Sequence, residues 1–356
     1  MNAPVNHSAS SGNGTQGRAT LLWLQSGGCG GCSMSLLNAE LPHLFDALAL
    51  AGIELLWHPS LSEESADEFM ALIERIRSGA QRLDILCLEG SVMLGPEGTG
   101  RFHLLPDGRP MMELIRELAQ LARHVVAVGT CAAYGGVTAA GGNVAEACGL
   151  QYDGAQPGGL LGADFRGRGG LPVVNISGCP VHPDWVLDAL ALLAADEMAQ
   201  QRDLDELARP RAYTDHLVHH GCPRNEYYEF KASAEAFGQQ GCMMENLGCL
   251  GTQARADCNI RPWNGGGSCL KGGYACINCT APEFEEPRHA FLETPKVAGI
   301  PVGLPTDMPK AWFVALASLA KAATPERLKR NAVAESVEMP PGAAQRRRAG
   351  SEGGGR

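Results

Sequence analysis

The chain has 356 residues, of which 45% are hydrophobic, 19% are charged and 13 are cysteines. This composition is typical of a soluble protein of one large or two modest domains, and it excludes a globally disordered chain. The 29 basic and 39 acidic residues give a net charge of −10, so we expect no nucleic-acid groove. The 45 glycines predict many tight turns and places where the backbone approaches a bulky group closely.

The two ends of the sequence bear on where in the cell the protein is expected. Residues 1–17 hold no basic cluster followed by an apolar run, so we expect neither a secretory nor a twin-arginine signal, and a cytoplasmic protein. The longest apolar stretch near the C-terminus, Ala311 to Ala320, is about half of what a membrane-spanning helix needs, so we expect no membrane span. Because disulfides are rare in a reducing compartment, the many cysteines favour metal ligation.

Short apolar runs alternate with longer amphipathic stretches between residues 19 and 195. We predict strands at 19–24, 53–58, 83–89, 124–129 and 172–177, and helices at 33–50, 65–77, 111–122 and 183–193. This alternation is typical of an α/β protein with a flavodoxin-like, doubly wound parallel sheet. Cys87 falls within a predicted strand and Cys148 within a helical-looking stretch, and we interpret both as buried structural thiols.

The character of the chain changes after residue 208. Between His219 and Pro287 glycine, cysteine, asparagine and proline are dense, and no regular hydrophobic period is sustained. Such a stretch cannot build an apolar core, so we expect bound metal to hold it. A last helix is predicted at 309–323. The predicted parts are a disordered N-terminus (1–18), a flavodoxin-like domain (19–208), an irregular metal-binding domain (209–323) and a disordered tail (324–356).

Four cysteines follow the carboxyl ends of predicted strands. Cys29 and Cys32 come after the first strand, Cys131 after the fourth and Cys179 after the fifth. These ends of a parallel sheet meet in one crevice, so we expect the four thiolates to converge around one inorganic group. A Cys-x-x-Cys redox pair and simple burial of the other two thiols are the competing interpretations. Glu89 enters the same crevice, where it orders either the loops or a subunit interface, and a surface carboxylate is the alternative.

Eight further candidate ligands lie in the irregular region, enough for two four-ligand centres. We divide them into the sets His219-x2-Cys222-x19-Cys242-x6-Cys249 and Cys258-x10-Cys269-x6-Cys276-x2-Cys279. Sets of this composition also hold structural zinc, so zinc and iron-sulfur clusters both stay open for this region taken alone. Three four-ligand sites in one chain favour a series of electron carriers.

Short motifs follow one another in a fixed order between residues 19 and 282. They are Leu22-Trp23-Leu24, Cys29-x2-Cys32-Ser33, Leu88-Glu89-Gly90-Ser91, Gly129-Thr130-Cys131-Ala132, Gly178-Cys179-Pro180, His219-x2-Cys222-Pro223-Arg224 and Cys276-Ile277-x-Cys279. This series resembles the small, electron-transferring subunit of nickel-iron hydrogenases. The resemblance implies an oxidoreductase subunit that acts on hydrogen only with a large subunit, which holds the nickel-iron centre, and no catalytic residue in this chain.

The resemblance also implies three 4Fe-4S clusters and their ligands. The proximal cluster would be held by Cys29, Cys32, Cys131 and Cys179, the medial one by Cys258, Cys269, Cys276 and Cys279, and the distal one by His219, Cys222, Cys242 and Cys249. Many family members carry a proline in place of Cys269 and a three-iron medial cluster, so this departure implies a fourth iron. Gly31 and Gly136 stand where some oxygen-tolerant members have two extra cysteines. The gap between the last two distal cysteines is one residue longer than the family pattern.

The expected lack of an export signal and membrane anchor, the three four-iron clusters and the polar tail together resemble the hydrogen-sensing, regulatory branch of the family. This branch implies a cytoplasmic complex that turns over hydrogen slowly and signals to a sensor histidine kinase through the tail at 324–356, and it allows a dimer of heterodimers. A cytoplasmic uptake hydrogenase is the alternative within the family, and a structural zinc-binding scaffold is the alternative from another class. A merely solubilising tail is the alternative to kinase docking.

Overall fold

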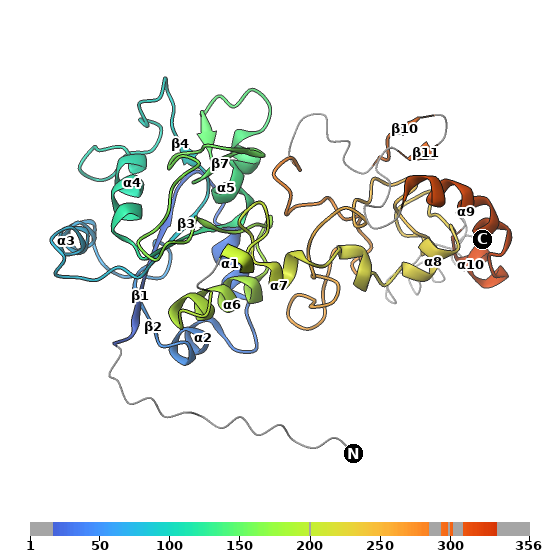
Figure 1. Cartoon of the computed structure of the whole chain (residues 1–356), viewed down its shortest axis with the longest axis horizontal. Helices are drawn as coiled ribbons and strands as arrows, with labels where there is room; N and C mark the ends of the chain where they lie inside the picture. Colours follow the sequence, from blue (N-terminus) through green and yellow to red (C-terminus); the bar gives the residue numbers. More distant parts are fainter. Residues whose placement is uncertain (1–16, 199–200, 285–292, 298–299, 302–308, 333–356) are drawn as a thin grey trace, which may run out of the picture.

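The computed structural model describes residues 17–198, 201–284, 293–297, 300–301 and 309–332 (Figure 1). The strands of the N-terminal half are β1 (Ala19–Gln25), β2 (Ile53–Trp57), β3 (Ile85–Glu89), β4 (Val92–Met93), β5 (His124–Val128), β6 (Ala147–Cys148), β7 (Tyr152–Asp153), β8 (Gln156–Pro157) and β9 (Val174–Ile176). Its helices are α1 (Gly31–Leu37), α2 (Leu44–Leu50), α3 (Ala66–Arg77), α4 (Met111–Leu121), α5 (Gly129–Tyr134), α6 (Pro183–Ala194) and α7 (Arg211–Thr214), with short 3-10 turns at Gly136–Ala139 and Gln201–Asp203.

Five of these strands form one parallel sheet in the order β2-β1-β3-β5-β9. The chain runs from β1 to one neighbour and then returns to the other side, so the order of the strands reverses between β1 and β3. At such a reversal the loops after the two strands part and leave a crevice at their carboxyl ends. The predicted flavodoxin-like, doubly wound sheet is therefore confirmed.

Alternating side chains of the strands build a core on each face of the sheet. In β1, Leu21 and Trp23 point to one face, where they pack with α1, α2 and α6. Leu22 and Leu24 point to the other face, where they pack with α3 and α4. The helices keep their apolar side toward the sheet, and α3 begins with a capping box formed by Ser65 and Glu68. The result is a three-layer arrangement that holds the strand ends rigidly.

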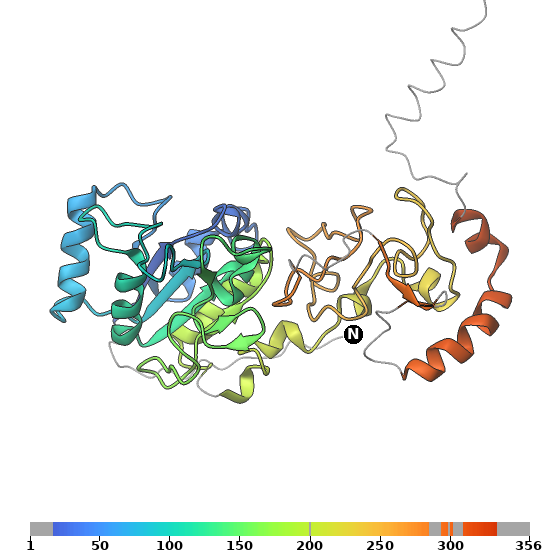
Figure 2. The same ribbon diagram turned by 90° about the horizontal axis from the view of Figure 1, so that it is seen from above.

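The C-terminal half has little regular structure. Its elements are a 3-10 turn at Val218–Gly221, α8 (Asn225–Glu229), β10 (Lys296–Val297), β11 (Ile300–Pro301), α9 (Lys310–Ala322) and α10 (Glu326–Ala332). Figures 1 and 2 show this half beside the sheet along the long axis of the molecule, with α9 and α10 at the end farthest from the sheet. Among the described residues, no helix combines the length and the apolar character that crossing a membrane requires.

Three sequence predictions differ from the structure. The helix predicted at 33–50 is divided into α1 and α2, because Pro42 between them has no N–H and cannot continue a helix. Cys148 lies in β6, which pairs with β4, rather than in a helix, although it is buried as expected. Disorder from residue 324 onward is wrong for the first part of the tail, which forms α10 with a fully buried Leu328. Residues 1–16 and 333–356, also expected to be disordered, lie outside the described residues.

Candidate metal centres

The first cysteine set lies in the crevice at the carboxyl ends of the sheet strands. Cys32 lies in α1, Cys131 in α5 and Cys179 three residues after the end of β9. The thiol of Cys32 is close enough to the other two to interact electrostatically with them. Cys29 is the exposed member of the set and its sulfur accepts the N–H of Gly31 at 3.3 Å. A Cβ atom on Gly31 would lie 3.7 Å from Pro180, so the Cys29 loop packs onto the segment after β9.

The side chain of Glu89 orders the loop that carries Cys29 and Cys32. One carboxylate oxygen accepts the backbone N–H groups of Cys32 at 3.0 Å and Ser33 at 3.1 Å. The other accepts Gln25 Nε2 at 2.9 Å, Trp23 Nε1 at 3.3 Å and the hydroxyl of Ser33. The residue is only 3% exposed, which rules out the interpretation of Glu89 as a surface carboxylate. Five donors satisfy the buried charge and fix the backbone that carries Cys32.

His58 is a supporting residue that the motifs did not identify. The backbone N–H of Ser60 donates to its Nδ1 at 3.1 Å, which leaves Nε2 to donate to the Ser33 hydroxyl at 3.1 Å. Its ring lies 5.2 Å from the ring of Trp23. Burial lowers the pKa of His58, which favours this neutral form. Because His58 directly follows β2, its place at a strand's carboxyl end was the available signal.

Two glycines leave room for sulfur in the crevice. Gly129 has a φ of +85°, and a Cβ atom there would stand 2.5 Å from the sulfur of Cys32. Gly136 has a φ of +59°, and its Cβ would stand 2.6 Å from the sulfur of Cys131. Any side chain at these positions would displace a predicted ligand. The sequence analysis connects the many glycines with a bulky inorganic group. In this crevice two of them leave the space that the thiols occupy.

The second set of four cysteines lines one cavity. Cys258, Cys269, Cys276 and Cys279 all contribute to its wall, together with Pro180 and Trp185 from the sheet half. Burial raises the pKa of Cys258 to about 12 and that of Cys276 well above its ordinary value. Thiols in a cavity of this kind are protonated at neutral pH unless a metal binds the sulfur and displaces the proton.

The third set lies next to this cavity. Burial raises the pKa of Cys222 to about 11 and that of Cys242 to about 12, and both thiols interact electrostatically with Cys249. The backbone N–H of Cys222 donates to the carbonyl of His219 at 3.0 Å, so a tight turn joins these two. The His219 ring meets the ring of Tyr228 edge to face, with the centroids 4.2 Å apart.

Direct contacts connect the three sets in series. The hydroxyl of Thr130, beside Cys131, donates to the carbonyl of Cys279 at 2.6 Å, and the backbone N–H of Cys179 donates to the Cys279 sulfur. At the other end, the backbone N–H of Leu250 donates to the carbonyl of Cys276 at 2.8 Å. The first set therefore adjoins the second, and the second adjoins the third.

The surroundings of these side chains fit a polynuclear group. A single zinc ion needs its ligands about 2.0–2.3 Å from one centre. No group of three His, Cys, Asp or Glu side chains in the described part of the chain is arranged to hold one ion. In an iron-sulfur cluster each cysteine binds a different iron, so the thiolates stand farther apart. Buried thiols, a shared cavity and glycines facing the sulfurs all fit such a cluster.

Both halves of the chain match known protein families. Residues 29–193 match the family described as NADH ubiquinone oxidoreductase, 20 Kd subunit, and residues 214–292 match the family of the C-terminal part of NiFe/NiFeSe hydrogenase small subunits. The F420 non-reducing hydrogenase II small subunit of Methanosarcina mazei is 35% identical over 75% of this chain and 73% of its own length. The periplasmic [NiFeSe] hydrogenase small subunit of Desulfomicrobium baculatum is 33% identical over 77% of this chain and 87% of its own length.

Solved structures agree with these matches. The actinobacterial-type NiFe-hydrogenase from Ralstonia eutropha H16 superposes with a TM-score of 0.71 at 31% identity, over 88% of this chain and 93% of that one. The Ni-Fe-Se hydrogenase from Desulfomicrobium baculatum superposes with a TM-score of 0.66 at 32% identity, over 78% of this chain and 100% of that one.

Proposed function

The chain belongs to the family of small subunits of nickel-iron hydrogenases, oxidoreductases that act on hydrogen together with a large subunit, and we propose that it relays electrons through three 4Fe-4S clusters. The first cysteine set is the proximal centre, the cavity-lining set the medial centre, and the set with His219 the distal centre. The nickel-iron centre, where hydrogen is split, lies on the large subunit. This chain's residues hold each cluster, exclude water from it and tune its potential.

The uninterrupted contact between the three sets is the observation that carries this proposal. Thr130 and Cys179 reach Cys279 from the sheet half, and Leu250 reaches Cys276 from the distal side. An electron that enters beside the sheet therefore finds the next centre directly adjacent. A scaffold protein has no need of three adjoining ligand sets in series.

Cys269 supports a four-iron medial cluster, since it lines the same cavity as the other three medial cysteines. Metal and sulfide analysis of the complex with its large subunit should give about twelve irons on this subunit. Cys269→Pro should lose about one of these and introduce the signal of a three-iron cluster in electron paramagnetic resonance (EPR) spectra. Cys148→Ser is the control, because that buried thiol lies outside all three sets. Zinc without sulfide in the unmodified complex would overturn the assignment.

In the cell, the proposed role is that of a cytoplasmic hydrogen sensor whose C-terminal segment docks on a histidine kinase, with a dimer of heterodimers as its assembly. Support comes from the surface that leads into this segment. On α9 Trp312 and Leu319 are exposed, and on α10 Lys329 and Arg330 are exposed as well. A helix surface with both apolar and basic side chains fits a protein partner better than a tail that only confers solubility.

Anaerobic co-purification tests this role. Truncation before Asn331 should leave hydrogen-dependent dye reduction intact and abolish kinase binding, while the full chain binds and turns over hydrogen slowly. A truncated chain that still retains the kinase would reject docking through this segment. Fast hydrogen turnover in the full complex would instead identify an uptake hydrogenase. The size of the full complex in solution would test the dimer of heterodimers.

A further inference from the structure

One lysine stands in an aromatic clamp beside the distal ligands. The Nζ atom of Lys231 lies 3.8 Å from the ring centroid of Tyr228 and 4.3 Å from that of Phe313 on α9. Tyr228 in turn packs against the ring of His219, and Lys231 interacts electrostatically with Cys242. A cation over two ring faces is stabilised by the electrons of the rings while its charge acts on the neighbouring ligands.

The backbone holds Lys231 in a conformation that lysine rarely adopts. Its φ is +54°, in the left-handed region, which is unfavourable for a residue with a Cβ atom. The turn that follows α8 imposes this conformation, because the N–H of Lys231 donates to Tyr228 at 3.1 Å and that of Ala232 donates to Tyr227 at 2.9 Å. Glycine would fit this backbone without strain, but it would place no charge here.

The C-terminal helices hold the clamp closed. The hydroxyl of Thr324 donates to the carbonyl of Phe230 at 2.8 Å, and Leu328 on α10 is fully buried against Tyr227. Arg327 pairs with Glu226 at 2.5 Å. The segment that precedes Lys231 is thus fastened to α10 and to the turn between α9 and α10.

Two acidic side chains also act on Lys231 electrostatically. Glu245, which is partly buried, accepts from Lys321 at 3.1 Å and from the hydroxyl of Ser233. Glu229, at the end of α8, is the other acidic group that acts on Lys231. In the described part of the chain Glu245 pairs with Lys321, and the ammonium group of Lys231 lies over the two rings.

We propose that Lys231 raises the reduction potential of the distal centre and that Phe313 on α9 holds its ammonium group in place. A nearby positive charge stabilises the reduced cluster, which carries one more negative charge than the oxidised one. The inference rests on the proposed function, since it takes His219, Cys222, Cys242 and Cys249 as the distal ligands. Under it, the C-terminal helices take part in setting the potential at which electrons leave the chain.

Redox titration of the complex with its large subunit, followed by EPR spectroscopy, tests this directly. Lys231→Asn removes the charge while asparagine tolerates the left-handed backbone. One of the three cluster potentials should shift to a more negative value, and the other two should stay in place. Lys231→Arg keeps the charge and should keep the potential. Lys329→Asn, which removes an exposed charge from α10, is the matched control. Three unchanged potentials in Lys231→Asn would overturn the inference.

Phe313→Leu provides a second variant that leaves the lysine in place. It should shift the same potential in the same direction by a smaller amount, because a ring that holds the ammonium is lost while the packing volume is largely retained. If Lys231→Asn fails to retain its iron, this variant decides the question, and an unchanged distal potential rejects the inference. The iron count of the unmodified complex separates the two proposals. A count that corresponds to only two clusters overturns the distal ligand set itself. Three clusters whose potentials do not respond to the substitutions overturn only the role of Lys231.

Discussion

Single atoms decide whether the crevice has room for a cluster. At Gly129 a positive φ and a 2.5 Å approach to the sulfur of Cys32 act together, so a side chain would strain the backbone and displace the ligand. Gly52, in the turn before β2, has a φ of +65° but nothing within 4 Å of its Cβ position. The two glycines share the backbone requirement and differ only in the contact with sulfur.

This pair gives a prediction at the residue scale. Gly52→Ala should cost about 1 kcal/mol of stability through backbone strain and keep the full iron content. Gly129→Ala should cost at least as much and also lose about four irons, because it displaces Cys32 from the proximal set. Thermal unfolding and iron analysis of both variants make the comparison. Equal iron in the two variants would show that Cys32 does not hold a cluster at this place.

At the scale of elements, α6 is fixed by the histidine at its start. Nδ1 of His182 accepts the N–H of Asp184 at 3.2 Å, and Nε2 donates to the carbonyl of Arg261 at 3.1 Å. Its ring lies 5.1 Å from Trp185 and 5.0 Å from Trp263. One neutral imidazole therefore caps a helix of the sheet half and attaches the irregular half to it.

The charge state of His182 predicts a pH dependence. Burial lowers its pKa from 6.5 to about 4, so the folded chain resists a proton that the unfolded chain accepts. Its contribution to stability is complete above pH 6.5 and is lost as the pH falls towards 4, by up to about 3 kcal/mol. His182→Gln should flatten this part of the stability–pH curve.

Other buried histidines contribute to the same slope, so the measured quantity is the difference between variant and parent. Burial also lowers the pKa values of His58 and His124, so both side chains should contribute to the loss of stability as the pH falls below 6.5. Denaturant unfolding at several pH values would supply the curves. A parent-like slope in His182→Gln would mean that this imidazole does not link its protonation to folding.

The elements were predictable from sequence to different degrees. The strands β1, β3 and β5 carry continuous apolar runs that periodicity finds. The cysteines after β1, β5 and β9 followed from the rule for carboxyl ends. The helix α10 was missed, because ERLKRNA is polar and only a few contacts, among them the fully buried Leu328 and the Arg327–Glu226 pair, fix it to the body of the protein. Lys231 was missed for a related reason: its environment is made by residues from α8 and α9, which are far apart in sequence.

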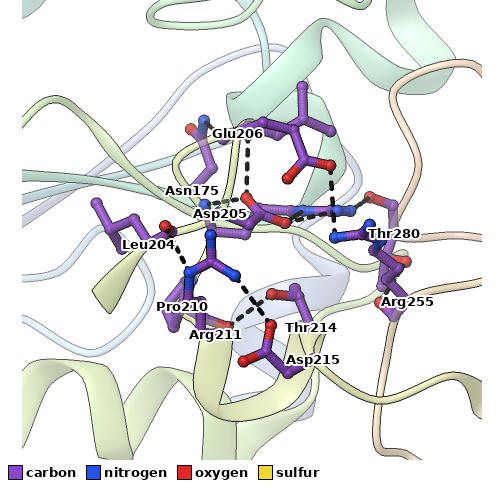
Figure 3. A network of polar contacts seen from close by, with 12 residues as sticks. Asn175, Leu204, Asp205, Glu206, Pro210, Arg211, Thr214, Asp215, Arg255 and Thr280 are labelled. Atoms are coloured by element: carbon purple, nitrogen blue, oxygen red, sulfur yellow. Dashed lines mark hydrogen bonds and ion pairs between the residues drawn. The ribbon is translucent and has the colours of Figure 1, made fainter. Parts of the chain in front are cut away.

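At the scale of the whole molecule, a buried ion pair joins the two halves. Arg209 and Asp205 are 2.7 Å apart, with side chains 4% and 0% exposed, and Arg209 Nη1 donates to the carbonyl of Thr280 at 3.0 Å. Thr280 directly follows Cys279, so the pair fixes the medial ligand segment to the sheet half. Figure 3 shows Asp205 and Thr280 facing one another across the junction.

The same region holds an exposed pair that serves as the comparison. Arg211 and Asp215 are 3.2 Å apart with side chains 47% and 55% exposed, and like the buried pair they are four residues apart (Figure 3). Asp215→Asn should therefore cost less than about 1 kcal/mol. Asp205→Asn should cost about 3–5 kcal/mol, because it leaves the charge of Arg209 buried without its partner.

The larger loss should also change the course of unfolding. With Asp205→Asn the irregular half loses its polar attachment at Thr280, so calorimetry should resolve two transitions where the parent has one. Removal of both charges in Asp205→Asn with Arg209→Met should recover part of the stability, since no unpaired charge then remains buried. If Asp205→Asn and Asp215→Asn lose the same amount of stability, another contact must hold the two halves together. The 2.6 Å hydrogen bond from Trp185 to Asp257 is then the candidate. Either result identifies the contact that keeps the medial centre next to the proximal one.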